Sequence, residues 1–229
     1  FIALALFCLT RPLDPKGRVL HLFSCFWAQM YVWLNPMWRQ KTEGRELLPW
    51  NQPAIFVANH QSLTDILVLF GLFRPFKWVS KASIFGVPFI GWNMRLNGYV
   101  RIVRGDRSSI EHMMNHCRTW LARGVPVLMF PEGTRSPDGD LKPFKNGAFQ
   151  LAVESGVPVV PIVIEGTKDT LPKHGFIMDN PGHVTARVLP SIDPGPFGDD
   201  VNALKEHVRS TIGRELISMR TAAKKPHLD

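Results

Sequence analysis

The sequence has little cysteine and lacks the spacings that bind metals or build disulfide frameworks. Its three cysteines in 229 residues, Cys8, Cys25 and Cys117, stand too far apart for a zinc site of the Cys-x-x-Cys type. The eight histidines include no His-Glu-x-x-His pattern. We therefore expect no catalytic or structural metal, and the cysteine usage suits a reducing compartment.

Motifs of several enzyme classes are also missing. There is no Gly-x-x-x-x-Gly-Lys-Ser/Thr loop, so a P-loop nucleotide site is not expected. No Gly-x-Ser-x-Gly elbow surrounds Ser62, and Cys117 falls inside a predicted helix. Neither residue is therefore favoured as a nucleophile. Internal repeats and low-complexity linkers are absent from the sequence as well.

The balance of charge is basic. The net charge is +8, and residues 71–145 hold twelve Lys or Arg against five Asp or Glu. A hydrophobic fraction of 45% and a mean hydropathy of −0.02 exclude a multi-span membrane protein and a disordered chain, and the length suits one domain. A basic surface can meet nucleic acid, anionic lipid headgroups or anionic substrates, or be an ordinary solvated face; composition leaves these open.

Long apolar runs are confined to the N-terminal part. The segment 1–9 is uniformly apolar, and the segment 19–38 has no formal charge, three tryptophans and an arginine at each flank. Polar residues dilute the longer run, which favours a monotopic or hairpin insertion over a clean span. We expect residues 1–40 to form a membrane-associated helical segment with a truncated start, since the first residue is not Met, and residues 41–229 to form the globular domain.

From about residue 41 the sequence alternates between short apolar strands and amphipathic helices. This alternation predicts an α/β fold with a mixed central sheet layered with helices. Ser108 or Ser109 would cap one helix, and Gly124 and Gly156 would each end one. Two strands contain proline and are expected near a sheet edge or at a strand end. The predicted strands are 54–58, 77–80, 99–103, 125–130, 157–164 and 184–188, and the predicted helices are 63–73, 108–123, 146–155 and 201–216, with an amphipathic stretch at 82–96.

A histidine and an aspartate follow the predicted strand 54–58. His60 and Asp65 are five residues apart, which would place them about 140° apart on one helix. They can meet only if His60 lies in the turn before the helix. Asp65 would then accept a hydrogen bond from one ring nitrogen and leave the other to act as a base. A helix-capping aspartate beside a loop histidine is the simpler alternative.

A second polar cluster follows the predicted strand 125–130. The segment 130–136 reads Phe-Pro-Glu-Gly-Thr-Arg-Ser. Arg135 carries the forked guanidinium that suits a phosphate, and Gly133 would let a ligand approach the backbone closely. Taken alone, this segment also fits a plain turn.

Together the two clusters resemble the glycerophospholipid acyltransferase family, which includes the 1-acyl-glycerol-3-phosphate acyltransferases. Between them, Lys81 and the segment 98–104 (Gly-Tyr-Val-Arg-Ile-Val-Arg) look like the second block of the family, and the segment 157–161 (Val-Pro-Val-Val-Pro) looks like its fourth. The resemblance covers roughly residues 43–193. Val103 replaces the acidic residue that is usual before the last arginine of the second block, so the fine acceptor specificity stays open.

The resemblance implies an O-acyltransferase that moves a fatty acyl group from acyl-CoA or acyl-carrier protein to the sn-2 hydroxyl of 1-acyl-glycerol-3-phosphate, forming phosphatidate. His60 would be the general base and Asp65 would orient it, with no acyl-enzyme. The acceptor's glycerol-phosphate would be bound by Glu132, Gly133, Thr134 and Arg135, with positive charge added by Arg101, Arg104 and Lys81.

The resemblance also bears on partners and location. It implies no cofactor beyond the acyl-CoA or acyl-carrier-protein co-substrate, a membrane lipid as acceptor, and no nucleic-acid partner. We expect attachment to a bacterial inner membrane through the N-terminal segment, with the active site on the cytoplasmic side. The sequence does not indicate an oligomeric state. Two alternatives remain: the same chemistry on glycerol-3-phosphate, a lysophospholipid or a lyso-aminolipid, and a non-catalytic module that binds anionic lipid.

Overall fold

A seven-stranded sheet forms the centre of the molecule in the computed structural model, which describes all residues except 51, 137, 169, 171–181 and 225–229. All neighbouring strands are parallel except β6 and β7, so the sheet is mixed, as predicted. The strand order across the sheet is β1 (Trp38–Glu43), β7 (Gly182–Val188), β6 (Val159–Glu165), β2 (Ile55–Ala58), β5 (Val127–Met129), β3 (Lys77–Lys81) and β4 (Val100–Ile102).

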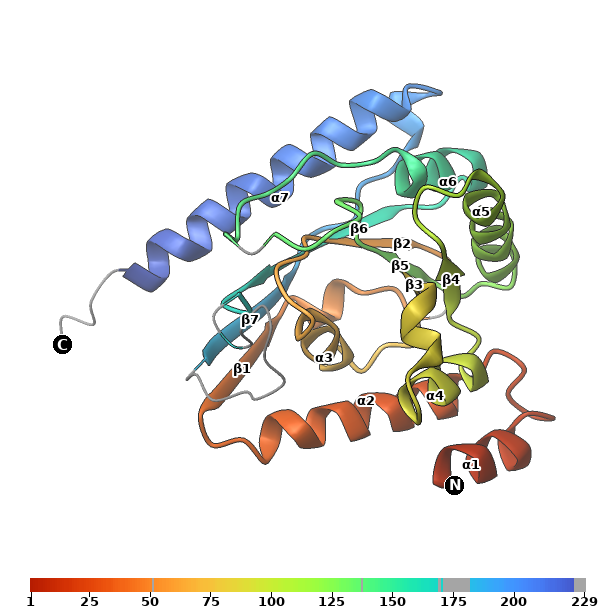
Figure 1. The fold of residues 1–229 in the computed structure, drawn as a ribbon. Coiled ribbons are helices and arrows are strands. Elements are labelled where there is room, and N and C mark those ends of the chain that lie inside the picture. The colour runs from red at the N-terminus through yellow and green to blue at the C-terminus, as the bar shows by residue number, and fades with distance from the viewer. Residues whose placement is uncertain (51, 137, 169, 171–181, 225–229) are drawn as a thin grey trace.

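Helices cover both faces of this sheet, which gives three layers (Figure 1). Alternate residues of β2 point to opposite faces, because side chains alternate along a strand. Ile55 and Val57 belong to the core under α5, α6 and α7, whereas Phe56 and Ala58 belong to the core over α2, α3 and α4. The helices are α1 (Ile2–Thr10), α2 (Arg18–Trp33), α3 (Asp65–Phe70), α4 (Ile90–Leu96), α5 (Arg107–Ala122), α6 (Gly147–Ser155) and α7 (Val201–Lys224), with 3-10 turns at Arg45–Leu47, Ala82–Gly86 and Gly195–Phe197.

Most predicted elements are present, with shifted ends. Gly156 ends α6 in the left-handed conformation at φ +60°, as expected from its lack of a side chain. The prediction that Ser108 or Ser109 caps α5 was wrong. Asp106 is the N-cap, and its carboxylate accepts a hydrogen bond from the backbone N–H of Ser109. A carboxylate at this position is also stabilised by the positive end of the helix dipole.

The proline-containing strands were expected near a sheet edge or with proline at a strand end; the edge position was wrong, and the strand-end position holds for Pro126 and Pro158. Both β5 and β6 lie beside β2 in the middle of the sheet. Pro126 and Pro158 precede the strands, so no ladder bond within them is lost there. Pro161 lies inside β6, and its carbonyl accepts from the N–H of Leu189, one residue past the end of β7. The missing N–H of Pro161 therefore falls where the β7 ladder stops.

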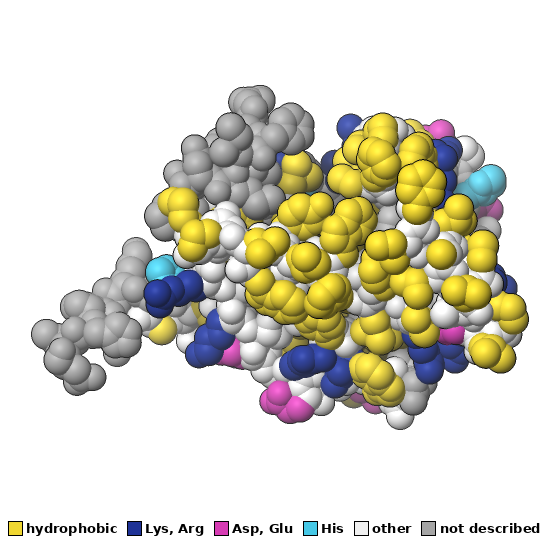
Figure 2. Space-filling model, turned by 90° about the horizontal axis from the view of Figure 1, so that it is seen from below, with side chains coloured by type: hydrophobic (Ala, Val, Ile, Leu, Met, Phe, Trp, Pro, Cys, Tyr) yellow, Lys and Arg dark blue, Asp and Glu magenta, His cyan; other side chains and the backbone are white. Residues whose placement is uncertain are grey.

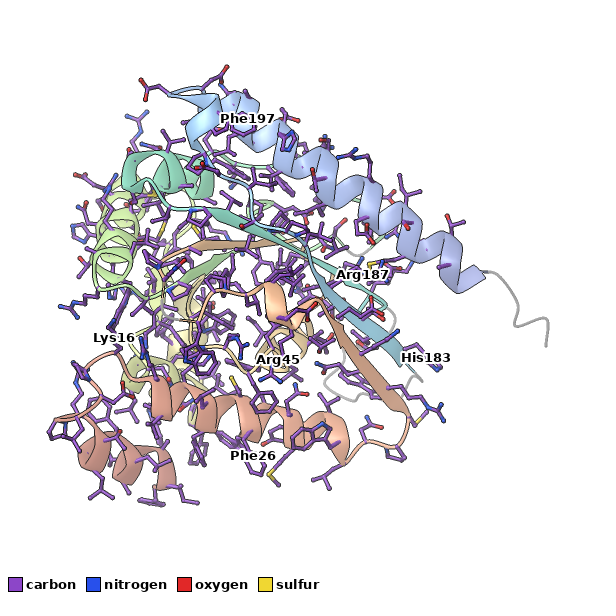
Figure 3. All side chains as sticks on the ribbon, turned by 180° about the vertical axis from the view of Figure 1, so that it is seen from behind. Lys16, Phe26, Arg45, His183, Arg187 and Phe197 are labelled. Atoms are coloured by element: carbon purple, nitrogen blue, oxygen red, sulfur yellow. The ribbon has the colours of Figure 1, made fainter. Side chains whose placement is uncertain are left out.

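Helix α2 packs against α3 and β1 with several of its polar residues buried, whereas α1 has no buried residue. In α2, His21, Ser24 and Gln29 are buried, and their side chains bond to Tyr99, Asn93 and Asn97, and the Leu67 carbonyl. Several apolar side chains of α2 point outward, as Phe26 does in Figure 3, whereas Leu20, Cys25, Ala28 and Val32 are buried. The exposed ones are Val19, Phe26, Trp27, Met30, Tyr31 and Trp33.

These outward side chains are part of a larger apolar face. Figure 2 shows hydrophobic side chains gathered on the side of the molecule that carries α1, α2 and α4. Phe89 and Trp92 of the α4 region contribute to it and are more than half exposed. The expected boundary at residue 40 falls inside β1, so this helical part runs directly into the sheet. No helix among the described residues is both long enough and apolar enough to cross a bilayer.

Candidate active site

The ends of β2 and β5 place the two polar clusters side by side. These strands are parallel neighbours, so their carboxyl ends lie at the same edge of the sheet. The end of β2 is fixed by Asn59, whose side chain makes two hydrogen bonds of 2.8 Å with the backbone of Ile164 in β6. His60 therefore starts the loop from a rigid point.

His60 and Asp65 form a hydrogen-bonded pair. The distance between His60 Nδ1 and Asp65 Oδ2 is 2.7 Å, and Asp65 is the fully buried first residue of α3. The same carboxylate oxygen accepts from the backbone N–H groups of Gln61 and Ser62. The imidazole also stacks on the Phe130 ring, with centroids 4.1 Å apart. With Nδ1 engaged, Nε2 is the ring nitrogen left to take a proton.

Glu132 lies under this pair and is occupied by backbone groups. One carboxylate oxygen accepts from the N–H of His60 at 2.8 Å, and the other accepts from the N–H of Lys142 at 3.1 Å. Burial raises the pKa of the Glu132 carboxyl. The family resemblance implied that Glu132 binds the acceptor; in the structure both of its carboxylate oxygens accept backbone hydrogen bonds, one of them from the histidine loop.

The rest of the 130–136 block forms a tight turn with one free cation. Gly133 has φ +67°, and a Cβ there would lie 3.0 Å from the Lys145 ammonium group, so both conformation and space favour glycine. Thr134 is exposed. The Arg135 carbonyl accepts from Lys142 Nζ, but the Arg135 guanidinium has no hydrogen bond or ion pair with any described residue.

The other three predicted cations lie further along the same edge. Lys81 ends β3, and Arg104 follows β4; both are exposed, and neither side chain has a hydrogen bond or ion pair within the described ranges. Arg101 is exposed too, and it lines a hollow of about 440 Å³ with His112 and His116 between β4 and α5. The structure therefore brings His60, Asp65 and the 130–136 block into contact, but it records no contact from Lys81, Arg101 or Arg104 to them.

Neither rival nucleophile is placed for chemistry. Cys117 is fully buried in α5, and burial raises its pKa to about 12, which leaves a neutral thiol. Ser62 is 5% exposed and is not hydrogen-bonded to His60. Among the residues that the structure describes, no group of three or more His, Cys, Asp or Glu could hold a metal ion.

Some contacts of the site were not apparent in the sequence. The N–H of Ser136 donates to the His60 carbonyl at 2.8 Å, and the Gln61 side chain donates to Glu165 at the end of β6. Ser136 belongs to the block already singled out, so its position was a usable signal. No feature of the sequence pointed to Glu165, because its hydrogen bond with Gln61 joins residues that are 104 positions apart.

Comparison with known proteins decides the family. The sequence model of the acyltransferase family matches residues 39–165, more than half of the chain. The chain belongs to the acyltransferase family. It is 44% identical over 203 residues to a 1-acyl-sn-glycerol-3-phosphate acyltransferase of Chlamydomonas reinhardtii, covering 88% of this chain and 60% of that protein. The chain thus spans about three fifths of the length of this algal relative.

Bacterial relatives match over more of their length. A 1-acyl-sn-glycerol-3-phosphate acyltransferase of Salmonella typhimurium is 31% identical over 223 residues, which cover 94% of this chain and 86% of the relative. The crystal structure of the 1-acyl-sn-glycerophosphate acyltransferase PlsC from Thermotoga maritima superposes with a TM-score of 0.76 at 30% identity, covering 90% of this chain and 82% of that one. The expected family and mixed α/β architecture are thereby confirmed.

Proposed function

We propose that this protein transfers a fatty acyl group from a thioester donor to the free hydroxyl of 1-acyl-glycerol-3-phosphate, forming phosphatidate. The observation that carries the proposal is the 2.7 Å pair between His60 and Asp65, held beside the block that contains Arg135. The names of the algal and bacterial relatives support this acceptor.

His60 acts as a general base in the proposed reaction. Its Nε2 removes the proton from the acceptor hydroxyl as the oxygen attacks the thioester carbonyl carbon. The new C–O bond forms, the C–S bond breaks, and the leaving thiolate takes the proton back from the imidazolium. Asp65 stabilises the imidazolium while it exists, because its carboxylate is fixed by two backbone N–H groups. No acyl-enzyme is formed.

Arg135 binds the phosphate of the acceptor in this proposal. Its guanidinium has no partner among the described residues and lies next to the turn that contacts His60, and a forked cation suits a phosphate monoester. Lys81, Arg101 and Arg104 add positive charge along the same edge, which favours the approach of an anion. Acyl-CoA or acyl-carrier protein serves as the donor, and no metal takes part.

The protein docks on a membrane through the apolar face of α1, α2 and α4. Two features support this part of the proposal. The side chains of α2 are arranged with polar groups inward and aromatic groups outward, and Trp and Tyr suit the bilayer interface. The acceptor is itself a membrane lipid. The lipid acceptor then comes from the bound leaflet and the thioester from the aqueous phase, on the cytoplasmic side of a bacterial inner membrane.

An acceptor panel tests the reaction. Purified protein is given one labelled acyl-CoA with lysophosphatidate, glycerol-3-phosphate or a zwitterionic lysophospholipid in parallel. We expect labelled phosphatidate from lysophosphatidate at the highest kcat/KM. Faster acylation of glycerol-3-phosphate or a lysophospholipid would move the activity to another acceptor with the same chemistry.

His60→Ala separates an enzyme from a lipid-binding module. We expect the variant to lose about 10²–10⁴-fold in kcat, which is the usual contribution of general base catalysis, while still binding vesicles. Unchanged turnover would contradict the role of His60.

For the membrane face, the double variant Trp27→Ser, Trp33→Ser should weaken cosedimentation with vesicles, whereas Ile217→Ser, at an exposed position of α7, should not.

A further inference from the structure

Arg220, near the end of α7, joins three segments around the histidine loop. Its Nη2 donates to the Gly139 carbonyl at 2.5 Å, and its Nε donates to Glu165 Oε2 at 3.3 Å. Its Nη1 lies 3.4 Å from Asp140 Oδ1. The Asp140 side chain is 82% exposed, so that pair is screened by water, whereas Glu165 is 19% exposed. The contacts to Gly139 and Glu165 are therefore the ones that can hold the segments together.

Two chains of hydrogen bonds lead from this guanidinium to the general base. In the first, the Glu165 oxygen that faces Arg220 also accepts from Gln61 Nε2 at 2.9 Å, and the Gln61 backbone donates to Asp65. Gln61 is the residue next to His60. Three elements distant in sequence, α7, β6 and the histidine loop, thus meet at one carboxylate.

The second chain passes through the loop after the 130–136 block. The N–H of Gly139 donates to the Ser136 carbonyl at 2.9 Å, and the N–H of Ser136 donates to the His60 carbonyl at 2.8 Å. Arg220 therefore reaches His60 from the side of the proposed phosphate-binding block as well as from the side of Gln61.

Gly139 is shaped for this contact. Its φ of +82° lies in the left-handed region, and a Cβ would stand 2.8 Å from Arg220 Nη2. A side chain at residue 139 would therefore strain the turn and displace the guanidinium. The loop conformation and the arginine depend on each other.

We propose that Arg220 is a positioning residue, which holds the general base and the phosphate-binding block at a fixed spacing. This inference rests on the proposed acyl transfer. Arg220 touches neither substrate nor reacting atoms in this account; it acts through Gly139 and Glu165. Catalysis is sensitive to such spacing, since a displacement of about 1 Å can cost about 10²-fold in rate.

The test compares Arg220→Ala and Arg220→Lys with Arg214→Ala as a matched control. Arg214 lies on the same helix, is exposed, and its side chain donates a hydrogen bond to Thr211 Oγ1 at 3.4 Å and to no other residue in the described part of the chain. The measured quantities are kcat, the KM for lysophosphatidate and the melting temperature. We expect kcat of Arg220→Ala to fall roughly tenfold or more with KM changed less than twofold, because the acceptor still binds but its hydroxyl is misplaced.

Arg220→Lys provides a graded result. Lysine keeps a positive charge near Glu165, but it lacks the separate guanidinium nitrogens that let arginine bond to Glu165 and to the Gly139 carbonyl together. The kcat of Arg220→Lys should therefore lie between those of Arg220→Ala and the original protein. If Arg220→Ala proves too unstable to assay, Arg220→Lys decides the question. Arg220→Lys with unchanged kcat, or a folded Arg220→Ala that matches Arg214→Ala, would overturn the inference.

His60→Ala keeps the two proposals apart. If His60→Ala is inactive and the Arg220 variants turn over normally, only the positioning role fails. If His60→Ala remains active, the proposed base fails, and a loss in the Arg220 variants would no longer support alignment of that base.

Discussion

The two halves of the candidate site differ in how fully their charged groups are partnered. In the histidine half, Asp65 accepts three hydrogen bonds and Glu132 accepts two, and both carboxylates are buried. In the cationic half, Lys81, Arg104 and Arg135 have no hydrogen bond or ion pair from their side chains to any residue that the structure describes.

This difference indicates which part of the site is complete before substrate arrives. The histidine half is preorganised, so little rearrangement is needed at the moment of proton transfer. The side chains of the cationic half have no ion pair with a described residue, so an incoming phosphate can bind them without breaking one of the ion pairs that the structure shows. Changes to the two halves should therefore have different kinetic signatures, the first in kcat and the second in KM.

Asp65→Asn should cause the largest change. Asparagine can still accept from backbone N–H groups, but it carries no charge to stabilise the imidazolium and can turn its amide N–H₂ toward His60 Nδ1. We expect kcat to fall about 10²-fold or more with KM for the acceptor nearly unchanged. Steady-state kinetics check this, and a loss confined to KM would contradict the division of the site.

Arg135→Ala should produce the opposite signature. A charge-assisted hydrogen bond to phosphate contributes about 1.5–3 kcal/mol, so KM for lysophosphatidate should rise roughly tenfold or more while kcat changes little. Arg118→Ala is the control, because Arg118 pairs with Glu154 on the surface away from the site. If KM rose for the acyl donor alone, Arg135 would belong to the donor site.

Glu132→Gln should act mainly on stability. Glutamine has one acceptor oxygen, so either the His60 or the Lys142 N–H would lose its partner, at a cost of about 1–3 kcal/mol in the free energy of unfolding. Burial raises the pKa of Glu132 in the folded protein, so the contribution of Glu132 is largest below the usual glutamate pKa and declines as pH rises through the raised pKa. Urea unfolding of both proteins across this range should show their difference shrinking with increasing pH; a growing difference would contradict the burial argument.

Added salt should have the smallest effect on the kinetics, and it should change KM, which depends on the cationic half, but not kcat, which depends on the histidine half. Charges on the surface are screened over about 10 Å at 0.1 M salt and about 3 Å at 1 M, whereas a buried pair is screened much less. With a soluble short-chain lysophosphatidate, KM should rise about threefold between low and high salt while kcat stays level. A fall in kcat with constant KM would indicate that the buried pair, not the exposed cations, senses the salt.

The sequence predicted six of the seven strands and the histidine–aspartate contact, because these follow from local order, but it missed β1, which lies where the expected N-terminal helical segment ends. A buried strand followed by His60, and a helix that begins at Asp65, leaves one way for the two side chains to meet. The family resemblance placed Glu132 on the acceptor, and no sequence pattern indicated the partners that its carboxylate has in the structure, the backbone N–H groups of His60, 72 residues away, and of Lys142. Likewise the polar residues of α2 appeared to dilute an apolar run, although they face the protein interior. The positions of these side chains depend on tertiary contacts between residues far apart in the sequence, and a short sequence segment does not show such contacts.

One comparison tests the central claim most directly: kcat/KM of the unmodified protein for lysophosphatidate and for the matching monoacylglycerol, which presents the same hydroxyl without the phosphate. If a preformed base serves an acceptor whose phosphate completes the cationic half, lysophosphatidate should be preferred by about 10²-fold, mainly through KM. Equal kcat/KM for the two lipids would contradict the account.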